Sequence, residues 1–271
     1  MSNAKPFVQS ADGTEIHGAE YGEGRPILIV HGGLGEAAHW DAVGHLLAPP
    51  YRVLGIERRV YGRSGKPQSP HSMAREAEDI AAILGKIGEP TVVVGHSSGG
   101  IASLEAALLH PANLAGLVLY EPPVQAGTPI GGDHQRLAEE ALVNGEGDKA
   151  LQIFFRDIVG FPQAMLDDMR SPKWRAGWDY MITILPNQMA DNRAIRALPP
   201  GVERYRAIDV PTLLLRGTES PKHLHERLTA LSGVLPHGEI VDLVGEAHSA
   251  NMSSPQMVAD AIAAFARKAF G

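Results

Sequence analysis

The chain has 271 residues, of which 44% are hydrophobic, 20% are charged and 6% are aromatic. This length and composition exclude a disordered, collagen-like or coiled-coil protein, and they suffice for a large α/β core. The formal net charge of −7 at pH 7 argues against a nucleic-acid partner. Because the sequence contains no cysteine, disulfides, thiolate catalysis and cysteine-ligated metals are excluded.

The N-terminal stretch has no apolar core of the kind found in a signal peptide. No apolar run reaches the ~18 residues that a membrane-spanning helix needs. We therefore expect a cytoplasmic protein whose partner is a small-molecule substrate, with no nucleic acid and no membrane involved. A homodimer is compatible with this expectation.

Strand-like and helix-like segments alternate along most of the chain. A β-hairpin is predicted at 5–21, around a turn at 11–13. Unbroken apolar runs, typical of strands buried on both faces, lie at 26–30, 52–56, 91–94, 114–120, 211–215 and 239–244. Helical periodicity is found at 36–47, 71–85, 99–110, 221–232 and 255–270. This alternation predicts an open, mostly parallel sheet with helices on both faces.

The alternation of strands and helices breaks between residues 122 and 206. This stretch opens and closes with Pro-Pro pairs and holds seven of the fifteen Phe, Trp and Tyr residues. We interpret 122–206 as an inserted helical cap and assign 1–121 and 207–271 to the core, as one structural domain overall. In the last helix of the core we expect Met257, Ile262, Phe265 and Ala269 to face inward.

Residues 95–99, Gly-His-Ser-Ser-Gly, match the G-x-S-x-G pattern between a β-branched strand and a helix. The flanking glycines permit a sharp turn that exposes Ser97 at a strained backbone conformation. We call this turn at residues 95–99 the elbow. On this motif the chain resembles the α/β-hydrolase fold superfamily over essentially its whole length. Residues 57–64 are similar to the D-x-R-G-x-G-x-S loop of that superfamily, with Val60 in place of the usual glycine. The resemblance implies an eight-stranded, mostly parallel sheet with a helical cap.

Residues 31–33, His-Gly-Gly, follow a predicted strand and resemble the superfamily's H-G-x turn. That resemblance implies an oxyanion hole made by the backbone N–H groups of Gly33 and Ser98. The same stretch also fits a dinucleotide-binding loop, with G-x-G-x-x-A at 33–38 and an acidic residue, Glu57, about 20 residues further on. His31 and Gly32 separate this loop from the preceding predicted strand, and a dinucleotide-binding site would not explain the G-x-S-x-G motif. We therefore favour the hydrolase interpretation.

His248, just after the last predicted strand, is the candidate general base, in the chain order expected after Ser97. His96 is expected to pack beside the elbow. His223 and His225 are interpreted as residues of a solvated helix rather than a metal site, and no metal or cofactor is predicted.

The acid that would orient His248 departs from the usual pattern. Most relatives carry it in a G-x-x-D turn after the strand that corresponds to 213–216, where this chain has Ser220, with Glu219 one residue earlier. Some haloalkane dehalogenases place it after the preceding strand, where this chain has Glu121. We prefer Glu121 and keep Glu219 as the alternative. A carboxylate at the C-terminal end of a sheet strand lies where ligands gather.

The resemblance implies a cofactor-independent serine hydrolase that cleaves a small ester, lactone or thioester through an acyl-enzyme on Ser97. Dehalogenases and epoxide hydrolases of this fold use aspartate at the elbow, so Ser97 argues against both. A lyase, cyclase or perhydrolase, or a hydrolase-like small-molecule receptor, remains the alternative. Apolar cap residues are expected to roof the substrate pocket, for which Trp40, Trp174 and Trp178 are candidates.

Overall fold

The structure is a computed structural model that describes residues 6–64 and 69–271. Residue 5, the first residue of the predicted hairpin, lies outside the described part. Within the described residues no helix is both long and apolar enough to cross a membrane.

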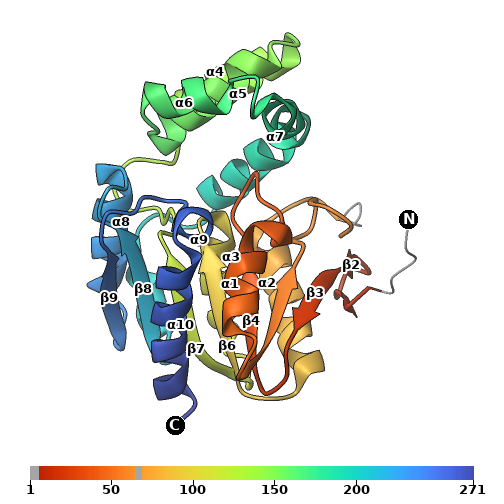
Figure 1. The fold of residues 1–271 in the computed structure, drawn as a ribbon, viewed down its shortest axis with the longest axis vertical. Helices are drawn as coiled ribbons and strands as arrows, with labels where there is room; N and C mark the ends of the chain where they lie inside the picture. The colour runs from red at the N-terminus through yellow and green to blue at the C-terminus, as the bar shows by residue number, and fades with distance from the viewer. Residues whose placement is uncertain (1–5, 65–68) are drawn as a thin grey trace.

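A seven-stranded sheet with the order β3-β5-β4-β6-β7-β8-β9 forms the centre of the molecule (Figure 1). All neighbouring strands are parallel except β3, which pairs with β5 in the antiparallel sense. The strands are β3 (Gly18–Tyr21), β4 (Arg25–Val30), β5 (Tyr51–Ile56), β6 (Thr91–His96), β7 (Leu114–Tyr120), β8 (Thr212–Gly217) and β9 (Gly238–Leu243). The predicted α/β class with a mostly parallel sheet is confirmed, but the central sheet of the described residues has seven strands rather than the expected eight, because β1 and β2 pair separately. The predicted N-terminal hairpin forms a separate two-stranded sheet of β1 (Val8–Gln9) and β2 (Glu15–Ile16).

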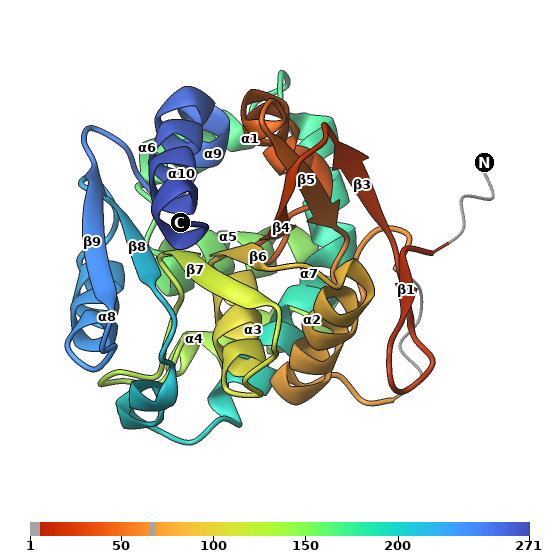
Figure 2. The same cartoon turned by 90° about the horizontal axis from the view of Figure 1, so that it is seen from below.

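The central strands are apolar without alternation because helices cover both faces of the sheet. In Figure 2 the helices α1 and α10 lie on one side of the sheet, and α2 and α3 lie on the other. Two separate hydrophobic clusters fill the two interfaces. The covering helices are α1 (Asp41–Leu47), α2 (Met73–Ile87), α3 (Ser98–Ala107), α8 (Lys222–Ser232) and α10 (Pro255–Ala269).

The packing of α10 differs from the sequence prediction at one position. Ile262 and Phe265 are buried as expected, whereas Met257 is 38% exposed and Val258 is fully buried in its place. Pro255 begins this helix, so the inward stripe starts at the fourth helical residue rather than the third.

Further helices lie between β7 and β8 in the chain, and Figure 1 shows them above one end of the sheet. We call this group the cap helices. They are α4 (His134–Val143), α5 (Gly147–Ile153), the π-helix η2 (Phe154–Val159), α6 (Gln163–Met169) and α7 (Arg175–Arg196). Short 3-10 helices η1 (Ala37–Trp40) and η3 (Glu203–Ala207), with the one-turn helix α9 (Ala250–Ser253), complete the described helices.

Candidate active site

Ser97 occupies a sharp turn between β6 and α3. Its backbone adopts φ 50° and ψ −125°, a conformation that is strained for a residue with a side chain. The turn is tight enough to demand glycines on both sides of it. A Cβ on Gly95 would lie 2.5 Å from Ser103 Oγ, and one on Gly99 would lie 2.2 Å from the carbonyl oxygen of His31. Close backbone approach therefore explains why the motif carries glycine at both positions.

His248 lies in the loop that follows β9, and its Nδ1–H donates a hydrogen bond of 2.6 Å to Glu121 Oε2. Glu121 directly follows β7 and is fully buried, with φ at 44°. Its second oxygen accepts a 2.8 Å hydrogen bond from the backbone N–H of Gly217. Both carboxylate oxygens are thus satisfied, as a buried charge requires.

Glu219, the alternative acid, lies in the turn after β8 with its side chain exposed. None of the hydrogen bonds or ion pairs within the described residues joins it to His248. Ser220, which stands where most relatives carry the acid, is buried with its hydroxyl unpaired among those residues. Since β7 and β8 are neighbouring parallel strands, a carboxylate after β7 reaches the same histidine as one after β8.

Ring stacking and a hydrogen bond hold the loop of His248 against the elbow. His96 stacks on Tyr120 with ring centroids 4.8 Å apart, and its Nε2–H donates to the backbone carbonyl of His248 at 2.9 Å. Burial, reinforced by the neighbouring ring of His248, holds the pKa of His96 well below its ordinary value, so this imidazole stays neutral. His96 therefore lies beside the elbow, as the sequence predicts, and positions the His248 loop.

Gly33 lies in the loop after β4, close to the elbow. No hydrogen bond within the described residues uses the backbone N–H of Gly33 or of Ser98, which leaves both groups available as donors. A side chain on Gly33 would collide with the cap, because its Cβ would lie 1.6 Å from Gln188 Oε1 in α7. Glu57 is the acid of the dinucleotide alternative, and its Oε1 instead accepts a hydrogen bond of 2.8 Å from Arg63 Nε.

His31, the first residue of this loop, is fully buried and holds the loop in place. Its Nδ1–H donates to the carbonyl of Gly32 at 2.7 Å, while its Nε2 accepts from the backbone N–H of Arg58 at 3.1 Å. Burial and the nearby charge of Arg58 lower the pKa of His31 to about 3. A neutral imidazole of fixed tautomer therefore links the loops after β4 and β5.

A cavity of about 730 Å³ connects the elbow with the cap helices. Ser97, His248 and Gly33 line it on the core side, together with Trp40. Apolar cap side chains line much of the remainder, among them Phe154, Phe155, Ile158, Phe161, Met165, Met169 and Met181. This is the mixture of apolar walls and few polar groups that is typical of a small-molecule site.

Two of the three tryptophans predicted to line the pocket do not line this cavity. Trp178 is fully buried inside the cap, where it packs near Phe155 and donates its indole N–H to Asp148 at 2.9 Å. Trp174 is 50% exposed, with the ammonium of Lys173 above its ring. The cap folds around its own aromatic core, so helical position alone did not indicate which rings face the cavity.

The interpretation of His223 and His225 as solvated residues is wrong. Both side chains are half-buried, since α8 packs against the end of the sheet. His223 lines the cavity, and burial together with the charge of Arg227 lowers its pKa. His225 Nε2–H donates to the carbonyl of Gly217 at 2.8 Å. His225 therefore bonds the turn after β8, and His223 forms part of the cavity wall.

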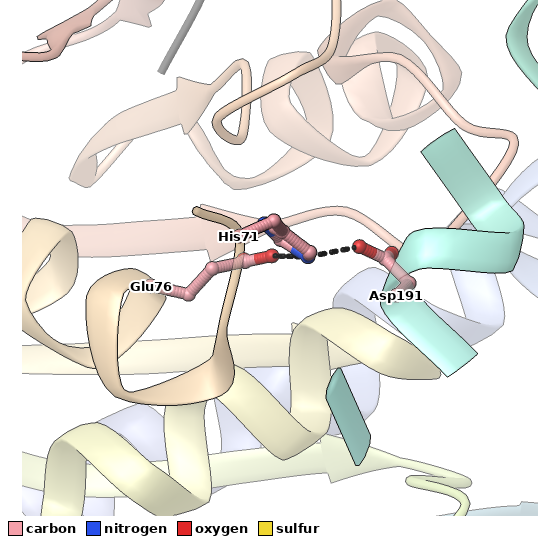
Figure 3. Close-up of side chains that lie close together, drawn as sticks. All are labelled: His71, Glu76 and Asp191. Atoms are coloured by element: carbon pink, nitrogen blue, oxygen red, sulfur yellow. Dashed lines mark hydrogen bonds and ion pairs between the residues drawn. The ribbon is translucent and has the colours of Figure 1, made fainter. Parts of the chain in front are cut away.

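A buried charged cluster lies beside the elbow and was not predicted from the sequence (Figure 3). Arg58 donates to Glu76 at 2.6 Å and to both Asp191 and Ser98 at about 3 Å. His71 Nε2–H donates to Asp191 at 2.8 Å. A histidine with two carboxylates is a donor set that suits a divalent cation. Because the Arg58 guanidinium already bonds both carboxylates, we interpret the cluster as an ion-pair network between cap and core.

The electrostatics of this cluster support that interpretation. Burial opposes the ionisation of Asp191, but Arg58 and His71 outweigh it and hold the pKa of this carboxyl below its ordinary value. Burial also opposes a charge on His71, yet Asp191 and Glu76 raise its pKa above the ordinary 6.5. Arg58 and His71, which holds its proton more tightly than a free imidazole, thus face the two carboxyl groups, and burial raises the pKa of Glu76. No local signal in the sequence joins Asp191 in the cap to Arg58 in the core.

Comparisons with known proteins agree with this fold. The model of the family described as "Alpha/beta hydrolase family" matches residues 27–261. A non-heme haloperoxidase of Rhodococcus erythropolis is 31% identical over 232 residues, which is 79% of this chain and 81% of that protein. A 2-(acetamidomethylene)succinate hydrolase of Mesorhizobium japonicum is 26% identical over 257 residues, covering 91% and 89% of the two chains.

Solved structures give the same result. An alpha/beta hydrolase from Sphaerobacter thermophilus superposes with a TM-score of 0.80 at 29% identity, over 95% of this chain and 98% of that one. The elbow at Ser97, the sheet that carries it and the match over residues 27–261 all point to the same family. The chain belongs to the alpha/beta hydrolase family.

Proposed function

We propose that this protein is a serine hydrolase that cleaves a small ester, lactone or thioester through an acyl-enzyme on Ser97. The observation that carries the proposal is the hydrogen bond of 2.6 Å between His248 and the buried carboxylate of Glu121, beside a strained serine in the same cavity. A nucleophile, a base and an orienting acid are the groups that acyl transfer needs.

In the proposed reaction, Ser97 Oγ attacks the substrate carbonyl carbon while His248 Nε2 takes the hydroxyl proton. The amide N–H groups of Gly33 and Ser98 stabilise the oxyanion of the tetrahedral intermediate. The bond from the carbonyl carbon to the leaving group then breaks, and His248 returns the proton to that group. Water, deprotonated by His248, attacks the acyl-enzyme, releases a carboxylic acid and restores Ser97.

Glu121 acts on His248 rather than on the substrate. By accepting the Nδ1 proton it fixes the tautomer in which Nε2 is unprotonated, and it stabilises the imidazolium that forms during each step. No step of this scheme uses a metal or a cofactor.

A fluorophosphonate probe tests the proposal directly, because it phosphonylates an activated serine. We expect the wild-type protein to be labelled and to hydrolyse p-nitrophenyl acetate, and Ser97→Ala to do neither. Ser103→Ala is the matched control, since Ser103 is buried in α3 and bonds the carbonyl of Gly99. A wild-type protein that is folded but neither labelled nor active would contradict the proposal and favour a receptor.

Perhydrolysis is the second candidate, favoured by the haloperoxidase of Rhodococcus erythropolis, which is 31% identical to this chain. Hydrogen peroxide would replace water in the second step, so that the acyl-enzyme yields a peracid. Supplying p-nitrophenyl acetate with hydrogen peroxide and measuring the ratio of peracid to acetic acid separates the two. A product that is mainly peracid at low peroxide would favour the perhydrolase.

A further inference from the structure

Gln188 lies in the cap helix α7 and is only 4% exposed, yet its side-chain carbonyl has no hydrogen-bond partner within the described residues. The side chain lines the cavity of Ser97. A buried acceptor without a donor is costly, and such a group in a native site calls for an explanation.

A chain of three amides fixes the direction in which Gln188 points. Gln188 Nε2 donates to Asn192 Oδ1 at 2.9 Å, and Asn192 Nδ2 donates to Gln135 Oε1 at 2.8 Å. Gln135 Nε2 in turn donates to the Glu139 carboxylate at 2.7 Å and to the backbone carbonyl of Met189 at 3.2 Å.

The two groups at the far end of this chain, a carboxylate and a carbonyl, can only accept hydrogen bonds. Gln135 must therefore turn its NH₂ toward them and its oxygen toward Asn192. The same constraint passes to Asn192 and then to Gln188, so no amide can flip without breaking a bond to its neighbour. The orientation of all three amides is thus set by Glu139, which lies outside the cavity. It leaves the carbonyl oxygen of Gln188 as an acceptor inside the cavity.

The position of the Gln188 carbonyl oxygen determines which hydrogen-bond donors can reach it. Gln188 Oε1 lies against Gly33, so closely that a Cβ on Gly33 would be 1.6 Å away. Gly33 is the proposed donor to the substrate oxyanion. A donor that reaches Gln188 Oε1 must therefore lie next to the scissile carbonyl. Because an acceptor cannot stabilise the oxyanion itself, its partner is a second group of the substrate.

We propose that the Gln188 carbonyl selects acyl groups that carry a hydroxyl or amide N–H on the carbon next to the scissile carbonyl. This inference rests on the proposed function. The cavity walls are largely apolar, so water is excluded from this part of the site. A substrate without the donor therefore leaves the buried Gln188 carbonyl unpaired, which is costly. Gln188 is then a specificity residue that contacts the substrate, and Gln135 is a positioning residue that acts through Asn192.

The test compares p-nitrophenyl esters of 2-hydroxypropionate, propionate and 2-methoxypropionate. The hydroxyl ester has the donor, and the other two lack it while differing in size. We expect the wild-type kcat/KM to favour the hydroxyl ester by roughly 10- to 100-fold over both others, after correction for hydroxide-catalysed rates. Equal corrected values in the wild-type protein would overturn the proposal.

Gln188→Met keeps the length of the side chain and removes the acceptor. We expect it to abolish the preference for the hydroxyl ester while it still hydrolyses propionate. Comparing the ratio between variants cancels the intrinsic reactivity of the esters. Gln135→Met tests the amide chain without touching the cavity, and we expect a smaller but measurable loss of preference.

Gln125→Met is the matched control, because Gln125 bonds backbone carbonyls of Ile195 and Leu198 at the end of α7 and does not line the cavity. It should keep the wild-type preference. A preference that survives in Gln188→Met would overturn the proposal. Fluorophosphonate labelling distinguishes this from failure of the proposed function, since a protein with unlabelled Ser97 refutes the hydrolase, whereas labelling without preference refutes only the role of Gln188.

Discussion

Asp191, in the cap helix α7, accepts a hydrogen bond of 3.0 Å from the hydroxyl of Ser98, the residue that follows the proposed nucleophile. The same carboxylate oxygen accepts from Arg58 at 3.0 Å and from the phenol of Tyr61 at 3.1 Å. Asp191 is fully buried. The cap is therefore tied to the first turn of α3 by a charged group that has no access to water.

Removing this carboxylate should destabilise the fold strongly. Asp191→Ala leaves the guanidinium of Arg58 buried with one partner fewer, so we expect the free energy of unfolding to fall by roughly 3–5 kcal/mol. Ser98→Ala removes one hydroxyl from the network and should cost about 1–2 kcal/mol. Urea unfolding at pH 7 measures both. Glu203→Ala, which breaks an exposed ion pair with Arg206, is the control and should change nothing measurable. Equally small changes in the free energy of unfolding for all three variants would contradict a stabilising link between Asp191 and the core.

His71 should make this tie sensitive to alkaline pH. Its pKa is raised above 6.5 by Asp191 and Glu76 in spite of its burial, so the folded protein holds the proton more tightly than the unfolded chain. The stabilisation is complete below pH 6.5 and is lost as the pH rises through the raised pKa. We expect the Tm of the wild-type protein, relative to His71→Gln, to fall as the pH rises from 6.5 through the raised pKa of His71.

The matched control for that titration is His237→Gln, because His237 is exposed and pairs with Asp209 at the surface. It should follow the wild-type curve. A wild-type Tm that runs parallel to that of His71→Gln over the whole range would contradict the assignment.

Glu121→Gln should impair catalysis much more than folding. Its amide oxygen can still accept from Gly217, which leaves an NH₂ group facing His248 Nδ1. That contact favours the tautomer with the proton on Nε2, which cannot act as the base. We expect kcat for p-nitrophenyl acetate to fall by roughly 10²- to 10⁴-fold. Glu219→Gln is the control and should stay within about twofold of wild type, as expected for an exposed side chain. The reverse pattern would move the acid to Glu219.

Gly33→Ala should reduce kcat/KM because the new methyl group collides with Gln188 and displaces a proposed oxyanion donor. We expect a loss of about 10-fold to 1,000-fold, the range for one such donor. In a Gln188→Ala background the collision is removed, so adding Gly33→Ala should cost much less. A double-mutant cycle on p-nitrophenyl acetate hydrolysis measures the coupling. Strict additivity would show that the collision is not the cause.

The two cap tryptophans should differ sharply in their effect on stability. Trp178→Ala empties a fully buried site and breaks the bond to Asp148, so we expect a loss of about 3–5 kcal/mol in the free energy of unfolding. Trp174→Ala removes a half-exposed ring and should cost far less. Chemical denaturation followed by circular dichroism compares them. Similar losses for both variants would show that Trp174 packs more tightly than its exposure indicates.

Hydrophobic periodicity in the sequence was sufficient to predict the architecture, because the pattern of apolar residues in each segment depends on which of its faces are buried. Apolar runs without alternation predicted strands covered on both faces, and β4, β6 and β7 are buried in this way. The same logic failed for Met257 and for the half-buried histidines of α8, where small shifts in helix packing decide which residues face inward.

The sequence by itself determined the fold class and the elbow at Ser97, since these depend on local patterns of apolar residues and glycines. It also named Glu121 and Glu219 as the two candidate acids, and only the tertiary structure decided which of them faces His248. The Asp191–Ser98 bond and the amide chain to Gln188 were likewise decided by tertiary structure alone. The Asp191–Ser98 bond joins residues 93 positions apart, and the Asn192–Gln135 bond within the amide chain joins residues 57 positions apart. Such contacts arise from how the cap packs on the core and how α7 packs against α4, not from any spacing along the chain.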